Sequence, residues 1–67
     1  MNEDVYRLRK LLEYWIEHNE DHSKRFSDAA NDAKKKGLVM VANYIQNAAL
    51  NMNEVTKSLR EALESLE

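Results

Sequence analysis

The chain has 67 residues with no cysteine and no proline, and ten lysines and arginines nearly balance twelve aspartates and glutamates, for a formal net charge of −2. A chain this short forms one domain at most, and without cysteine neither disulfides nor thiolate metal ligands can stabilise its small core. The interspersed charges disfavour nucleic acid as a partner, no apolar run approaches the roughly 18 residues of a membrane span, and the N-terminus does not resemble a secretory signal. We therefore expect a cytoplasmic protein that binds neither nucleic acid nor membranes.

The first predicted helix spans about residues 3–36. Asn2 can cap its start, and Glu3 and Asp4 place negative charge in the first turn, where the helix dipole favours it. Lysines at 34, 35 and 36 place positive charge in the last turn, directly before Gly37, the only glycine. Because glycine readily adopts the left-handed conformation that closes helices, we predict the turn at Gly37.

The second predicted helix spans about residues 38–66, since no turn signal interrupts it. Both helices carry residues at alternating spacings of three and four, the pattern of an a/d seam. The predicted seam comprises Val5, Leu8, Leu12, Trp15, Asn19, His22, Phe26, Ala29 and Ala33, then Leu38, Val41, Ile45, Ala48, Met52, Val55, Leu59, Ala62 and Leu66. Two helices joined by so short a turn must lie antiparallel, so we predict an all-α fold, one helical hairpin over residues 1–67.

The apolar face of the predicted hairpin is wider than one neighbouring helix can cover. Further apolar residues extend the seam on both sides: Leu11, Ile16, Ala30, Ala42, Ala49 and Leu63. An exposed apolar face of this size favours self-association, and the simplest closed solution is a twofold homodimer that forms a four-helix bundle.

Polar residues interrupt the seam at one height of the hairpin. Folding about Gly37 brings Asn19 level with Thr56, and His22 level with Met52. A polar layer in an apolar bundle commonly fixes register. In one interpretation, His22 is a neutral core imidazole hydrogen-bonded to Thr56, to Asn19 or to their symmetry mates in a dimer, with His18 merely on the surface.

The other interpretation is a metal site. His18 and His22 are four residues apart, so their rings are neighbours on the helix surface and could chelate one divalent ion. Asp21 and Met52 are the further candidate ligands, and a second copy could supply another histidine pair. Nickel, zinc and copper all suit imidazole ligands, and the function would be metal storage, sensing or delivery.

The residues do not predict an enzyme. Asn19 stands where the H-E-x-x-H motif of zinc proteases requires its glutamate, and no nucleophile constellation is present. The alternative function is a metal-free interaction module that docks its apolar face on a second copy or on another helical protein, with the polar layer setting register.

Trp15, His18, Asn19 and His22 form a W-x-x-H-N-x-x-H segment, and Phe26 and several alanines follow it. This segment resembles an uncharacterised family of short microbial helical hairpins. The match covers the first helix, whereas the second helix agrees only as a generic amphipathic helix. The resemblance implies that the four residues act as a set and suggests a metal-related role without identifying an activity.

Overall fold

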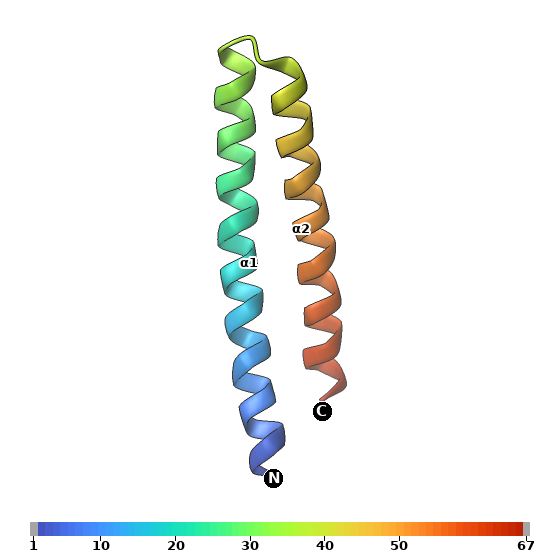
Figure 1. The fold of residues 1–67 in the computed structure, drawn as a ribbon. Coiled ribbons are helices and arrows are strands. Elements are labelled where there is room, and N and C mark those ends of the chain that lie inside the picture. The colour runs from blue at the N-terminus through green and yellow to red at the C-terminus, as the bar shows by residue number, and fades with distance from the viewer. Residues whose placement is uncertain (1, 67) are drawn as a thin grey trace.

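The computed structural model describes residues 2–66 and shows two long antiparallel helices packed along their length (Figure 1). Helix α1 comprises Glu3–Lys35 and helix α2 comprises Val39–Ser65. The predicted all-α helical hairpin is confirmed. Residues 1 and 67, which the predicted unit includes, lie outside the described part of the chain. The molecule measures 53 × 14 × 11 Å, so it is a rod one layer thick.

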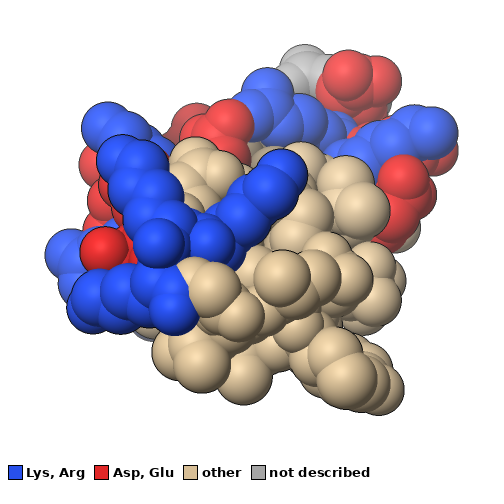
Figure 2. Space-filling model, turned by 90° about the horizontal axis from the view of Figure 1, so that it is seen from above, with Lys and Arg blue, Asp and Glu red and all other residues tan. Residues whose placement is uncertain are grey.

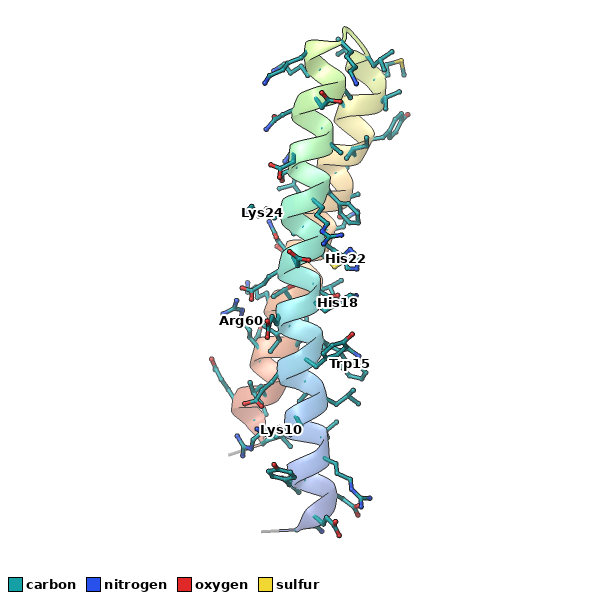
Figure 3. All side chains as sticks on the ribbon, turned by 90° about the vertical axis from the view of Figure 1, so that its left-hand side faces the viewer. Lys10, Trp15, His18, His22, Lys24 and Arg60 are labelled. Carbon is teal, nitrogen blue, oxygen red and sulfur yellow. The ribbon has the colours of Figure 1, made fainter. Side chains whose placement is uncertain are left out.

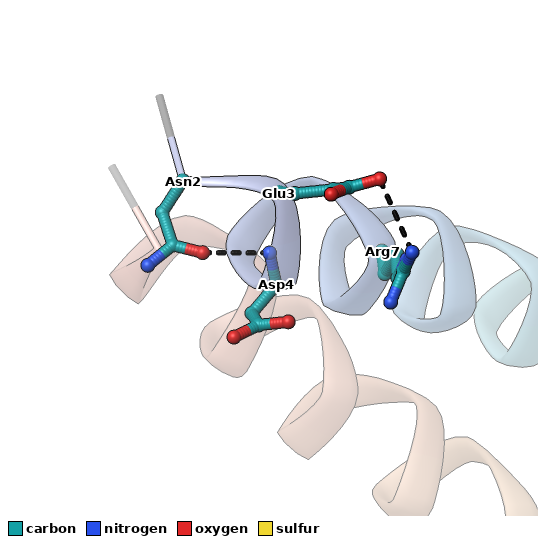
Figure 4. Close-up of polar contacts among 4 residues, drawn as sticks. All are labelled: Asn2, Glu3, Asp4 and Arg7. Carbon is teal, nitrogen blue, oxygen red and sulfur yellow. Dashed lines mark hydrogen bonds and ion pairs between the residues drawn. The ribbon is translucent and has the colours of Figure 1, made fainter.

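The start of α1 is fixed by local side-chain contacts (Figure 4). The side-chain oxygen of Asn2 accepts a hydrogen bond of 2.6 Å from the backbone N–H of Asp4. This contact satisfies one of the donors that a helix start leaves unpaired. One turn later, Arg7 donates to the carboxylate of Glu3 at 3.1 Å. The predicted N-cap is thus present, with acidic residues in the first turn.

The turn between the helices depends on Gly37, which has φ of 81°. Its N–H donates to the carbonyl of Lys34, and the N–H of Leu38 donates to the carbonyl of Ala33, both at 3.0 Å. These two bonds form a Schellman motif, which satisfies carbonyls at the end of α1. A Cβ atom at position 37 would meet nothing within 4 Å. Glycine is therefore favoured here by backbone conformation and not by lack of space.

The interface between α1 and α2 is lined mostly by small residues. The buried side chains are Leu12, Ile16, Ser23, Ala30 and Ala33 on α1, and Ala42, Ala49 and Thr56 on α2. Small side chains let two helices approach closely, and the few large ones pack around them. We call this set of eight residues the inner seam.

The predicted a/d seam is only partly the inner seam. Leu12 and Ala33 are buried as predicted, but Leu8, Trp15 and Val55 remain 44%, 39% and 47% exposed. The two helices are rotated so that the heptad row of Ile16, Ser23 and Ala30 faces inward instead. Periodicity marks the whole apolar arc of a helix, whereas the side-chain sizes within the arc decide which part meets the partner helix.

Several apolar side chains outside the inner seam form one surface, the outer apolar face. Its residues are Leu8, Leu11, Trp15, Phe26 and Ala29 on α1, and Val41, Ala48, Met52 and Val55 on α2. Their helical positions direct them to the same side of the hairpin. Viewed from the turn, uncharged residues cover one side, whereas lysines and arginines gather away from it (Figure 2). The hairpin therefore has one apolar and one charged side.

Candidate metal-binding site

The two histidines lie side by side on the outer surface of α1. His18 is exposed and His22 is half-buried. Their Nε2 atoms are 2.9 Å apart, and the ring planes are nearly perpendicular, at 86° with centroids 4.3 Å apart. Both side chains project to the same side as Trp15, away from Lys24 and Arg60 (Figure 3). The pair thus borders the outer apolar face.

Two further rings extend the histidine pair along α1. Tyr14 stacks on His18 with centroids 5.5 Å apart and planes 13° apart, and Phe26 stacks on His22 at 5.9 Å and 23°. The four rings occupy consecutive i, i+4 positions, which are neighbours on a helix surface. The i, i+4 spacing in the sequence predicts this row, to which Tyr14 also belongs. The outer rings restrict how each imidazole can turn.

The separation of the two Nε2 atoms is compatible with two chemical states. In the absence of an ion, one neutral imidazole donates an N–H to the lone pair of the other. Alternatively, both lone pairs bind one ion. Metal–nitrogen bonds of about 2.0–2.1 Å that meet at a right angle place the two nitrogens roughly 2.9 Å apart. The side chains would need little movement to change from one state to the other.

A single hairpin offers two imidazole nitrogens as candidate ligands. Across residues 2–66, no group of three or more histidine, cysteine, aspartate or glutamate side chains is placed to hold a metal ion. Asp21, a predicted ligand, pairs instead with Arg25 at 3.3 Å, and its side chain is exposed. Met52, the other predicted ligand, is half-buried on α2. A complete ligand shell requires donors from outside one hairpin or from water.

The polar layer of the hairpin differs from the predicted one. Ser23 replaces His22 as the inward polar residue of α1. Its Oγ donates to Asn53 Oδ1 at 2.6 Å and lies 3.3 Å from the carbonyl oxygen of Ala49. Thr56 is buried as well, but its Oγ1 has no hydrogen-bond partner among residues 2–66. The predicted hydrogen bond of His22 to Thr56 is therefore wrong, because His22 lies on the outer side of the inner seam.

Ser23 is a buried polar residue that the predicted a/d seam does not include. Serine is small and commonly exposed, so it does not mark an apolar arc. Its signal is the heptad spacing of Ile16, Ser23 and Ala30, all of which are buried. This second heptad row runs beside the row of Leu8, Trp15 and His22. The structure shows that it is the one that meets α2.

On the charged side, one ion pair connects the two helices. Arg60 of α2 donates to the carboxylate of Glu20 on α1. Both side chains are about half exposed, so this contact contributes little to stability. It nevertheless marks the side of the hairpin that stays polar. The histidine pair and this ion pair lie on different sides of α1 (Figure 3).

Neither helix in the described part of the chain is long and apolar enough to cross a membrane. No curated protein and no solved structure matches the chain significantly. One family does match: its sequence profile covers residues 8–66, which includes the histidine pair, the turn and all of α2. The resemblance to an uncharacterised family is thereby confirmed, and the chain belongs to the family described as "Domain of unknown function (DUF8180)".

Proposed function

We propose that this protein binds a divalent transition metal ion through His18 and His22, in metal storage, sensing or delivery. The observation that carries the proposal is the 2.9 Å separation of the two Nε2 atoms. It matches two neighbouring ligands that meet at a right angle at one ion, as in square-planar copper or nickel sites, and both imidazoles are accessible from the surface. Nickel, zinc and copper fit nitrogen ligands of this kind.

Self-association is the second part of the proposed function. The inner seam buries only two large aliphatic side chains, Leu12 and Ile16, and four alanines. Burial of so few large groups stabilises a hairpin weakly. Large side chains such as Leu8, Trp15 and Val55 stay exposed on the outer apolar face. A twofold homodimer, arranged as a four-helix bundle, would remove them from water.

The test is a titration of the purified protein, free of affinity tag, with Zn²⁺, Ni²⁺ and Cu²⁺, followed by calorimetry and thermal melting. We expect saturable binding and a melting temperature that rises with metal concentration, since an ion that binds only the folded state stabilises it. The single variants His18→Ala and His22→Ala should abolish the effect. Lys24→Ala, an exposed change on the same helix, should preserve it. Retention of binding in both histidine variants would refute the proposal.

Two further variants examine the remaining candidate ligands. Asp21→Asn and Met52→Leu keep the approximate shape of each side chain and remove its donor. A large loss of affinity in either variant would add that residue to the ligand shell. Because Asp21 pairs with Arg25 and not with the histidines, we expect Asp21→Asn to bind metal nearly as well as the parent protein.

A metal-free interaction module is the alternative function. It is favoured by the outer apolar face, which could dock on a second copy or on another helical protein. The hydrogen bond between the buried Ser23 and the exposed Asn53 also favours it, because this bond could fix register. Chelator-treated protein distinguishes the two functions. If the alternative function is correct, the chelator-treated protein keeps its oligomeric mass and its melting temperature. Neither function involves catalysis.

A further inference from the structure

The hairpin exposes more surface than a compact protein of its mass. Its accessible surface is 5240 Å² for 7.9 kDa. Folded monomers of that mass expose about 4400 Å², so the excess is roughly 800 Å². One partner in a standard protein–protein interface buries about that area. The excess is therefore sufficient for one stable interface with a second copy.

Side-chain size along α1 indicates how the second copy is oriented. On the outer side of α1, Leu8 and Leu11 lie in the N-terminal half, whereas Ala29 lies with Phe26 in the C-terminal half. An antiparallel copy of α1 sets Leu11 level with Ala29, so that a large side chain meets a small one. A parallel copy sets leucine on leucine and alanine on alanine, which crowds one end and leaves a void at the other.

Charge along α1 favours the same orientation. Glu3 and Asp4 lie in the first turn, and Lys34 and Lys35 lie in the last turn. Antiparallel pairing of α1 with its copy brings the acidic end of one helix beside the basic end of the other. Parallel pairing brings like charges together at both ends, which is unfavourable.

The histidine pair lies at the middle of α1. Helix α1 runs from Glu3 to Lys35, so Asn19 is its central residue. Full antiparallel overlap of two α1 helices therefore places the twofold axis within about one residue of Asn19, a distance of roughly 1.5 Å along the helix. With the axis at position 20, one residue from that centre, His18 of one hairpin comes level with His22 of the other, and His22 with His18. The two pairs then face each other across the axis.

We propose that two hairpins pair with α1 antiparallel to α1 about a twofold axis between His18 and His22, forming one site of four imidazoles for one transition metal ion. The metal in this proposal rests on the proposed function, whereas the orientation of the dimer rests on surface area, side-chain size and charge. Two nitrogens from each hairpin complete the four-coordinate shell that one hairpin lacks. The site exists only in the dimer, so metal binding and dimerisation strengthen each other.

Cysteine cross-linking tests the orientation directly, because the natural chain has no cysteine. The variants Leu11→Cys and Ala29→Cys are made separately and oxidised alone and as a mixture. The mixture should give a covalent heterodimer at least ten times more efficiently than either variant alone. Position 11 of one copy lies about 27 Å along the helix from position 11 of the other, too far for a disulfide. Homodimers from each single variant, or no heterodimer, would overturn the orientation.

A second cysteine pair controls for disturbance of the outer apolar face. Asp4→Cys and Lys36→Cys lie at exposed positions near the two ends of α1. They should also cross-link with each other and not with themselves. Circular dichroism of each variant verifies that the helices are intact.

Metal stoichiometry tests the four-imidazole site. Native mass spectrometry with Zn²⁺ should show one ion per two chains, and His18→Ala or His22→Ala should lower the affinity at least 100-fold. One ion per single hairpin would overturn the shared site and leave the proposed metal-binding function standing. Absence of Zn²⁺, Ni²⁺ and Cu²⁺ binding in a protein that still gives the expected cross-links would instead refute the metal function, and with it the shared site.

Discussion

The inner seam and the outer apolar face differ in a way that is unusual for a protein that acts alone. The buried seam holds small side chains, including Ala30, Ala42 and Ala49, which are at most 5% exposed. The outer face holds large ones, including Trp15 and Val55, which are more than one-third exposed. Large apolar groups give most of the free energy of burial. The comparison indicates that the seam sets how closely the helices approach, whereas the outer face carries the apolar area available for association.

The largest expected effect comes from the few large residues of the inner seam. Leu12→Ala should lower the free energy of unfolding by about 2–4 kcal/mol, because it removes buried methyl groups and leaves a cavity. A core of this size supplies only about 3–5 kcal/mol. The variant should therefore lose much of its helical circular dichroism at 25 °C. Leu50→Ala, a control at a 54% exposed position, should change stability by no more than about 0.5 kcal/mol.

The Trp15→Ala variant tests the role of the outer apolar face without changing the inner seam. If the outer face is the dimer interface, the change should cost about 1.5 kcal/mol per subunit and raise the dimer dissociation constant roughly 100-fold. Sedimentation equilibrium measures this constant. The matched aromatic control is Tyr6→Ala, since Tyr6 is 52% exposed and lies against Lys10 on another side of α1. An unchanged dissociation constant in Trp15→Ala would place the interface elsewhere.

Thr56→Val should stabilise the hairpin by about 1 kcal/mol. The hydroxyl of Thr56 is buried without a hydrogen-bond partner, so replacing it with a methyl group of similar size removes a desolvation cost. Chemical denaturation with urea measures the difference.

Ser23→Ala is the natural contrast to Thr56→Val within the same seam. The Ser23 hydroxyl is hydrogen-bonded to Asn53, so its removal should destabilise by about 1 kcal/mol. Opposite signs in these two variants would separate a satisfied buried hydroxyl from an unsatisfied one. Equal signs would mean that the Thr56 hydroxyl has a partner in solution, such as a bound water.

The smallest effect is expected at the surface of the turn end, away from both apolar regions. The Lys36 ammonium donates a hydrogen bond to Asp32 at 2.9 Å and adds positive charge, and both effects lower the pKa of Asp32 below its ordinary value of 3.8. A carboxyl whose pKa is lowered by folding contributes stability above its unfolded pKa. That contribution is lost as the pH falls through the folded pKa.

Asp32→Asn should accordingly lower the melting temperature slightly at pH 7, and the difference from the parent protein should vanish once the pH falls below the folded pKa of Asp32. Thermal melts across this pH range measure it. Lys36→Met should cause a similar small loss at pH 7, because it removes the other partner. An effect as large as that of Leu12→Ala would contradict the view that this exposed ion pair contributes little.

The sequence by itself determined the helices, their direction and the turn. The cap at Asn2, the charges at the two ends of α1 and the left-handed Gly37 act over a few residues, and the structure shows each of them in place. The i, i+4 spacing of His18 and His22 likewise predicts neighbouring rings. Local chemistry of this kind does not depend on what packs against the helix.

Only the tertiary structure decided which part of the apolar arc faces α2. Two heptad rows lie within the apolar arc of α1, and periodicity alone does not indicate which of them faces α2. The row with Ser23 and Ala30 meets α2 because its small side chains allow close approach, which leaves Trp15 and His22 on the outside. The contact of the two histidine rings and the unpaired hydroxyl of Thr56 follow from that rotation, since packing of one helix on the other fixes which side chains are enclosed.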